Sequence, residues 1–186
     1  QGIFEGAIHD IHLKDIGEIV DVPLDGKCSG PFVVNFNLDD LSKFVLNLDL
    51  TMNEGKFYTF NTKTIRADVT LTGDMWKINN PKVDLHNGGT IIGEGYVSNK
   101  GLDVKVKSNN LDLYAFGLER KTASGSINFE GVASGSLDVP RVKGNLWSNN
   151  LTIMEMPVNT VKSEVYVHDD ILAMAPFVIR PIDGSI

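Results

Sequence analysis

The chain has 186 residues, of which 42% are hydrophobic and 22% are charged, as expected for a folded domain with a buried core. Its 17 basic and 24 acidic residues give a net charge of −7, so no nucleic-acid partner is expected. A single cysteine, Cys28, excludes an internal disulfide and a cysteine-based zinc site. No run of about 18 apolar residues is present to span a bilayer.

The first segment with possible chemistry is "HDIHLKD", which contains His9 and His12. Three residues apart on a strand, these side chains point to opposite faces and cannot share a metal ion. Cys28 follows in "DGKCSGP", with no histidine nearby in sequence to activate it as a nucleophile. Neither these residues nor any later motif predicts a catalytic group, a metal site or a cofactor, so the protein is not expected to be an enzyme.

Strands are predicted along most of the chain, because apolar residues recur at every second position. The alternation occupies residues 32–38, 44–50, 65–71, 102–106 and 161–167. The polar residues between them indicate a sheet with one apolar face and one wet face. Residues 39–43 also fit a helical period, so a short helical turn competes there with the start of a strand.

Turn-forming residues separate these segments at short intervals, which predicts hairpins and meanders. The expected turns are Asn53–Gly55, Gly73–Asp74, Asn79–Pro81, Asn87–Gly89, Asn99–Gly101 and Asp169–Asp170. The glycine-containing segments "GEG" at 93–95 and "GVASG" at 131–135 lack the context of a dinucleotide fingerprint or a nucleophile elbow, and they are interpreted as strand bends.

Two internal repeats are present. "SNNLDL" at 108–113 matches "SNNLTI" at 148–153, and "MWKINNPKVDLHNGGTI" at 75–91 aligns with "DILAMAPFVIRPIDGSI" at 170–186. Stacked copies of an all-β unit bury a continuous face that no single unit could bury. We therefore expect one continuous domain over residues 1–186, elongated and all-β. The pattern allows either an open curved sheet with an apolar inner face or a closed β-sandwich.

The order of these motifs resembles the TamB family and the wider AsmA-like group. The resemblance is carried by "GGTIIGEG" at 88–95, by "VKGNLWSNNLTI" at 142–153 and by the alternating segment 159–171. It implies an antiparallel or mixed sheet folded lengthwise into an open groove, called a β-taco or half-barrel. The chain starts at Gln1 without a signal pattern and ends on "PIDGSI", so we expect a piece of a longer protein.

The resemblance also implies a place and a function. The implied location is the bacterial periplasm, with the longer chain anchored in the inner membrane by a segment outside this piece. The implied function is the movement of phospholipid between the two membranes. A TamA-like outer-membrane barrel is the implied partner. The alternative function is a chaperone or scaffold for unfolded β-barrel or autotransporter clients, which would pair with an exposed sheet edge.

A lipid groove would be lined by the alternating apolar residues, because the burial of each CH₂ group of an acyl chain contributes about 0.8 kcal/mol without a dedicated site. The alternative is that the same residues form a closed core. The predicted lining residues are Ile65, Ala67, Val69, Leu71, Leu102, Val104, Val106, Leu111, Leu113, Ile127, Phe129, Leu151, Ile153, Val161, Val165 and Val167.

Overall fold

The computed structural model describes residues 1–12, 14, 24–57, 60–73, 75–116, 122–136, 139–168, 171–175 and 178–181. These residues form strands and one 3₁₀ turn. In chain order the elements are β1 (Gly2–His12), β2 (Leu24–Asp25), β3 (Lys27–Asn37), β4 (Asp40–Phe57), β5 (Phe60–Thr72), β6 (Met75–Leu85), β7 (Thr90–Ser98), β8 (Gly101–Asp112), η1 (Leu113–Phe116), β9 (Ala123–Ser124), β10 (Ser126–Gly135), β11 (Pro140–Ser148), β12 (Leu151–Ile153), β13 (Met156–His168), β14 (Ile171–Met174) and β15 (Val178–Pro181).

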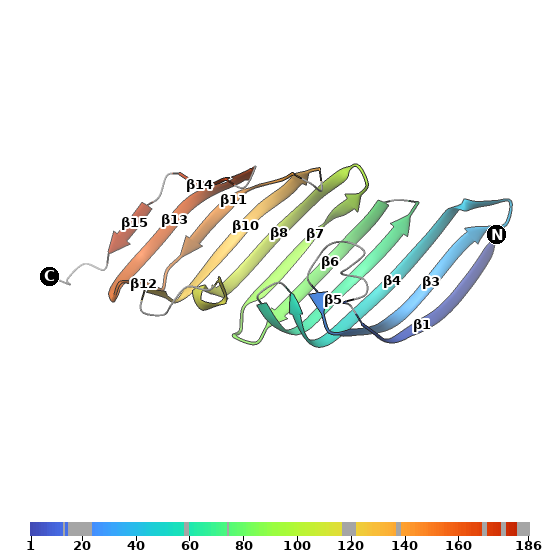
Figure 1. The fold of residues 1–186 in the computed structure, drawn as a ribbon, viewed down its shortest axis with the longest axis horizontal. Helices are drawn as coiled ribbons and strands as arrows, with labels where there is room; N and C mark the ends of the chain where they lie inside the picture. Colours follow the sequence, from blue (N-terminus) through green and yellow to red (C-terminus); the bar gives the residue numbers. More distant parts are fainter. Residues whose placement is uncertain are drawn as a thin grey trace.

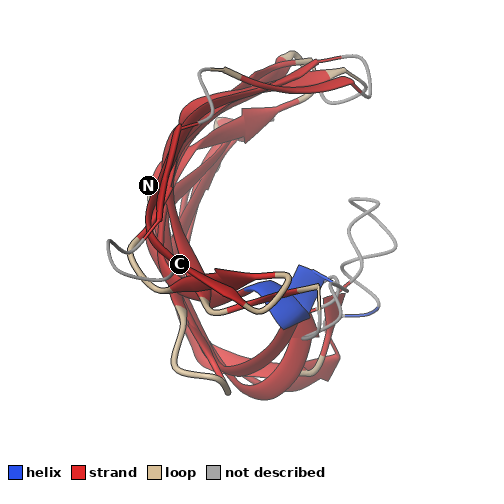
Figure 2. Cartoon of the chain, turned by 90° about the vertical axis from the view of Figure 1, so that its left-hand side faces the viewer, coloured by secondary structure: helices blue, strands red, loops and turns tan. Residues whose placement is uncertain are grey.

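All of these strands belong to one 15-stranded sheet, and the long strands pair in sequence order from β1 to β13. Every pair in the described residues is antiparallel. The sheet is long (Figure 1) and curves into a trough that does not close (Figure 2). The open, curved all-β fold is thereby confirmed, and the closed β-sandwich is wrong.

The helical turn considered for residues 39–43 is also wrong. Leu38 and Asp39 form a two-residue turn, in which the Asp39 N–H donates to the Asn37 side-chain oxygen at 3.1 Å, and β4 starts at Asp40. The alternation of the following apolar residues therefore prevails over the helical period. Among the described residues no helix has the length and apolar character needed to cross a bilayer.

Strand register places the apolar residues of successive strands opposite one another, on what we call the inner face. One row, the wall row, crosses ten strands without a charged residue. It consists of Gly6, Phe32, Leu48, Val69, Ile78, Gly95, Val104, Ala133, Val142 and Val167. Directly paired residues in a sheet point to the same side, so these side chains form one continuous apolar surface.

A second row on the inner face marks the bend of the sheet, and we call it the corner row. It consists of Ile11, Cys28, Met52, Ile65, Val83, Ile91, Ser108, Phe129, Leu146 and Ser163. Cys28, Met52 and Ser108 are only 2–3% exposed. This burial is expected where side chains converge on the concave side of a bend, so the inner face is the concave one.

Irregular pairing beside the corner row produces the bend. Asp10, Glu54, Asn80 and Asn110 lie inside β1, β4, β6 and β8, and all four have positive φ, between 47° and 55°. The register shifts next to three of them, in β1, β6 and β8. Such β-bulges bend a strand and increase its twist. Because they lie near one line across the sheet, in β1 and in every second strand from β4 to β8, the whole sheet folds lengthwise.

Two of the predicted turns are not turns in the structure. Asn53–Gly55 lies inside β4 and Asn79–Pro81 lies inside β6, so both segments are bulges and not hairpin turns. Turns do occur at Gly73, at residues 86–89 and at residues 99–100. The turn predicted at Asp169–Asp170 lies outside the described residues.

The sheet contains two structurally equivalent halves, about 100 residues apart in sequence. Asp10 in β1 and Asn110 in β8 have φ values of 53° and 54°. The N–H of each donates to a side chain of the next long strand, Ser29 Oγ at 3.1 Å and Asn128 Oδ1 at 3.0 Å. Strands β1 to β6 therefore correspond to β8 to β15, with β7 between the halves. The repeat found at 75–91 and 170–186 fits this correspondence where it is described, because β6 pairs with β5 as β14 and β15 pair with β13.

The bulge in β8 can be tested at Asn110, whose left-handed backbone is tolerated by asparagine and glycine but not by β-branched residues. We expect Asn110→Val to lower the free energy of unfolding by about 1–2 kcal/mol, and Asn110→Gly to change it by less than about 0.5 kcal/mol. Urea unfolding followed by circular dichroism measures both. Equal stability of the two variants would show that the bulge does not depend on this conformation.

Candidate functional site

The candidate site is the inner face, and strand register places on it all of the predicted lining residues that lie in β5, β8, β10 and β13. Most of them are half-buried and keep part of their surface open to the trough. These are Ile65, Ala67, Val69, Leu71, Leu102, Val104, Val106, Phe129, Ile153 and Val167. The wall of the trough therefore presents accessible apolar side chains.

The remaining predicted residues are buried: Leu111, Leu113, Ile127, Leu151, Val161 and Val165. All but Val165 belong to one packed cluster that also contains Leu85 and Val158. The cluster lies at the lower lip of the trough in Figure 1, where η1 and the short strands β9 and β12 continue the sheet past the bend. These side chains form a small hydrophobic core that holds the lip in place.

The list of predicted lining residues omitted much of the N-terminal half and all of β6 and β11. Phe32 and Leu48 show clear alternation in sequence, yet only the structure joins them to Val69 in one row. Ile78 and Val83 share the inner face although they are five residues apart, because the bulge at Asn80 lies between them. Simple alternation therefore misses residues on either side of a bulge.

The middle of the wall is flattened by glycines. Gly93 and Gly95 of β7 and Gly131 of β10 occupy inward positions in regularly paired strands, so they are not the strand bends that the sequence indicated. A Cβ atom added at Gly131 would come within 2.5 Å of the Phe129 ring, which packs over it and over Gly144. Glycine at 131 and 144 therefore allows the Phe129 ring to lie flat against the sheet.

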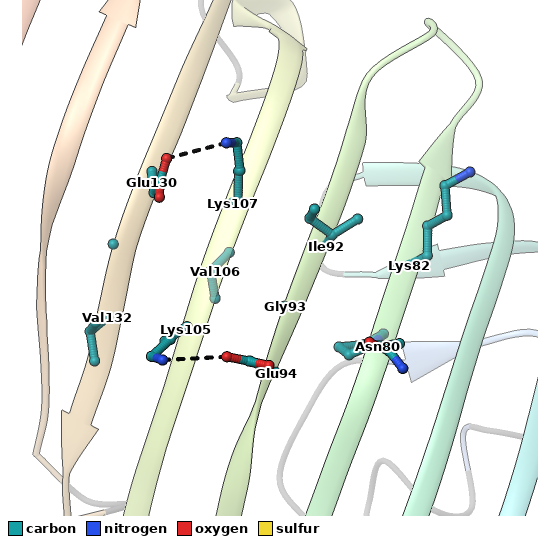
Figure 3. Close-up of a pocket in the computed structure, with 12 residues that line it drawn as sticks. Asn80, Lys82, Ile92, Gly93, Glu94, Lys105, Val106, Lys107, Glu130 and Val132 are labelled. Atoms are coloured by element: carbon teal, nitrogen blue, oxygen red, sulfur yellow. Dashed lines mark hydrogen bonds and ion pairs between the residues drawn. The ribbon is translucent and has the colours of Figure 1, made fainter.

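Two ion pairs join neighbouring strands on the outer face. Lys105 Nζ lies 3.3 Å from a carboxylate oxygen of Glu94, and Lys107 Nζ lies 3.4 Å from one of Glu130 (Figure 3). The four side chains border a shallow depression of about 540 Å³. Because each charge has a partner across the strands, the depression offers no unpaired charge to a ligand. Ile92 and Val132 also line it and are 41% and 37% exposed, so this part of the outer face combines apolar side chains with neutralised charges.

Strict alternation, which predicts that His9 and His12 point to opposite faces, fails in β1. Ile8 and Ile11 share the inner face although they are three positions apart, because Asp10 forms a bulge. Among the described residues, however, no three His, Cys, Asp or Glu side chains gather where they could hold a metal ion. His86 lies 2.8 Å from Glu54, an ion pair when the histidine is protonated, and this contact connects the β6–β7 turn to the bulge of β4.

The Cys28 side chain is part of the corner row, between Ile11 and Met52 on the neighbouring strands. Burial raises the pKa of its thiol, and a backbone hydrogen bond opposes this effect more weakly. The thiolate is the reactive form of cysteine, so the position favours an inert packing residue.

Comparison with known proteins finds no matching family model, no similar curated protein and no similar solved structure.

The low reactivity of Cys28 is directly measurable. With 5,5′-dithiobis(2-nitrobenzoic acid) at pH 8, we expect its rate to be lower by about tenfold or more than that of an outer-face cysteine in a Lys105→Cys variant. Guanidinium chloride should remove the difference, because unfolding restores the ordinary thiol pKa. Equal rates in the folded protein would contradict the buried position.

The division between wall and lip predicts different costs of truncation. Leu111, 6% exposed, lies in the packed cluster, so Leu111→Ala should lower the free energy of unfolding by about 2–4 kcal/mol. Val104 lies half-open on the wall, so Val104→Ala should cost less than about 1 kcal/mol. Chemical denaturation of both variants tests this. Similar large losses would mean that the wall is a closed core after all.

Proposed function

We propose that this chain is a segment of a hydrophobic conduit that carries phospholipid, with the acyl chains lying along the inner face of the trough. The observation that supports the proposal is the uncharged wall row, which extends through ten strands of a single open sheet. At a strand spacing of about 4.8 Å, ten strands cover a path of roughly 43 Å.

The apolar face needs a partner, because contiguous exposed apolar surface of this extent is unusual on a soluble protein. An acyl chain fits this need without a specific pocket, since hydrophobic attraction is non-directional and scales with the area that is buried. The same property allows movement, because a lipid tail shifted along the row exchanges one set of apolar contacts for an equivalent set. The open side of the trough leaves a polar headgroup in water.

The surrounding chemistry is compatible with transport. The glycines at 93 and 95 carry no side chain into the trough, and those at 131 and 144 are covered by the Phe129 ring. Lys105 and Lys107 of the outer face are paired with Glu94 and Glu130, and the net charge of −7 disfavours adsorption to anionic headgroups. Together with the resemblance to the TamB family, these features support a place in a bacterial envelope between two membranes, and a role in binding and guiding lipid without catalysis.

Site-specific photo-cross-linking tests the conduit. A benzophenone amino acid is placed on the inner face at Val69 or Val104 and, as matched controls on the same strands, at the outward neighbours Asp68 or Asp103. The protein is irradiated with vesicles of phosphatidylethanolamine and phosphatidylglycerol, and adducts are identified by mass spectrometry. We expect lipid adducts at the inner positions, at least about tenfold above the outer ones.

Two results would oppose the proposal. Equal lipid labelling of both faces would indicate non-specific adsorption. Labelling of an added unfolded outer-membrane β-barrel protein, with no lipid adduct at Val69 or Val104, would favour the chaperone function.

A further inference from the structure

A third row of inward residues, which we call the small row, lies between the wall row and the corner row. Strand register joins its members in the order Gly93, Val106, Gly131, Gly144 and Val165. At Gly131 and Gly144 two adjacent strands, β10 and β11, present no side chain to the trough at this level. The row itself therefore leaves a space above the backbone of these two strands.

The ring of Phe129 fills this space. Phe129 belongs to the corner row and lies on the same face of β10 as Gly131, two residues later in the strand. A Cβ atom added at Gly131 would lie 2.5 Å from Cζ of the ring, and one added at Gly144 would lie 2.6 Å from the same atom. The ring therefore reaches from the corner row across both glycines. It occupies the position that two ordinary side chains would have.

The N-terminal half of the sheet has the opposite arrangement. Gly30 is the counterpart of Phe129, since each of them directly follows the side chain that accepts the N–H of the bulge in its half. Two residues later Phe32 stands where β10 has Gly131, and its ring covers Gly6 of β1, 2.6 Å from an added Cβ atom. Phenylalanine and glycine are thus exchanged between the halves. The sheet can be built with no ring at the place of Phe129.

We propose that Phe129 sets the depth of the trough in its C-terminal half, and that the conduit thereby selects unbranched acyl chains. This inference rests on the proposed function. With the ring flat against the sheet, an acyl chain lies along the wall row, beside Ala133 and Val142, and does not enter the small row. A straight chain contacts this surface along its whole length, whereas a methyl branch holds the chain away from it and removes part of the dispersion contact.

Truncation of Phe129 opens the small row. In Phe129→Ala the two glycines form a slot two strands wide, roughly 10 Å at the usual strand spacing, which accepts methyl branches. Phe129→Leu keeps a branched side chain over the glycines and is the matched control. Circular dichroism verifies that the variants are folded, and Phe129→Val replaces the alanine variant if the strand signal is lost.

Competition with a fluorescent fatty acid measures the selectivity. The probe is cis-parinaric acid, a linear polyene that fluoresces in apolar surroundings. It is displaced by palmitic acid or by phytanic acid, which has the same main chain with methyl branches. We expect the native chain and Phe129→Leu to bind palmitic acid at least about fivefold more tightly than phytanic acid, and Phe129→Ala to lower this ratio to about two or less.

Photolabelling locates the bound chain. Palmitic acid with a diazirine in the middle of its chain is irradiated with each protein, and the labelled residues are identified by peptide mass spectrometry. In the native chain the label should be found at Ala133 and Val142. In Phe129→Ala the labelling of Gly131 and Gly144 should rise by at least about fivefold, because the ring no longer covers them.

Two results would overturn this inference alone. One is an unchanged ratio of the two affinities in Phe129→Ala, and the other is equal labelling of the two glycines in the native and alanine proteins, each with fatty acid still bound to the inner face. A native chain that binds no probe and takes up no label on the inner face would instead contradict the proposed function, and this inference with it.

Discussion

The structure depends on one constraint: in a single-layer sheet, the apolar side chains of successive strands must meet in register on the concave face, as they do in the wall row and the corner row. A shift of one residue in a strand would turn its apolar side outward. The sheet nevertheless bends, and each bulge preserves the facing of the residues around it. Ile8 and Ile11 lie on one face, as do Ser108 and Leu111, although the members of each pair are three positions apart in the sequence. The bend is therefore gained without loss of the apolar surface.

The strands could be predicted from the sequence, because burial of one face imposes alternation directly on it. Residues 65–71 and 102–106 are examples, and both lie in regular strands. The bulges could not be predicted, because Asn-Glu-Gly at 53–55 and Asn-Asn-Pro at 79–81 have the residues of a turn. A turn and a β-bulge favour the same residue types, because asparagine and glycine tolerate positive φ and because both structures tolerate the missing N–H of proline. Only the neighbouring strands decide whether the chain reverses or continues.

The sequence also does not predict which residues of the candidate site are accessible and which are buried. Val104 and Leu111 are apolar residues of one strand, and the alternation gives no sign that one faces an open trough while the other lies in a packed lip. Burial at these positions depends on which side of the corner row the residue lies, and hence on curvature produced by several strands together. The repeated "SNNL" segments are a sequence signal of this region, since the buried Ser108 lies in the corner row and the buried Ser148 lies two residues beyond Leu146 of that row.

The pairing of the long strands in sequence order has a consequence for how the molecule forms. Each long strand finds its partner within a few tens of residues, so little chain entropy is lost in closing the intervening loops. Assembly can start at any hairpin and extend by one strand at a time, as in other repetitive architectures. A chain that emerges slowly, from a ribosome or through a membrane, could therefore acquire its sheet progressively and keep its apolar surface ordered while the rest is still unfolded.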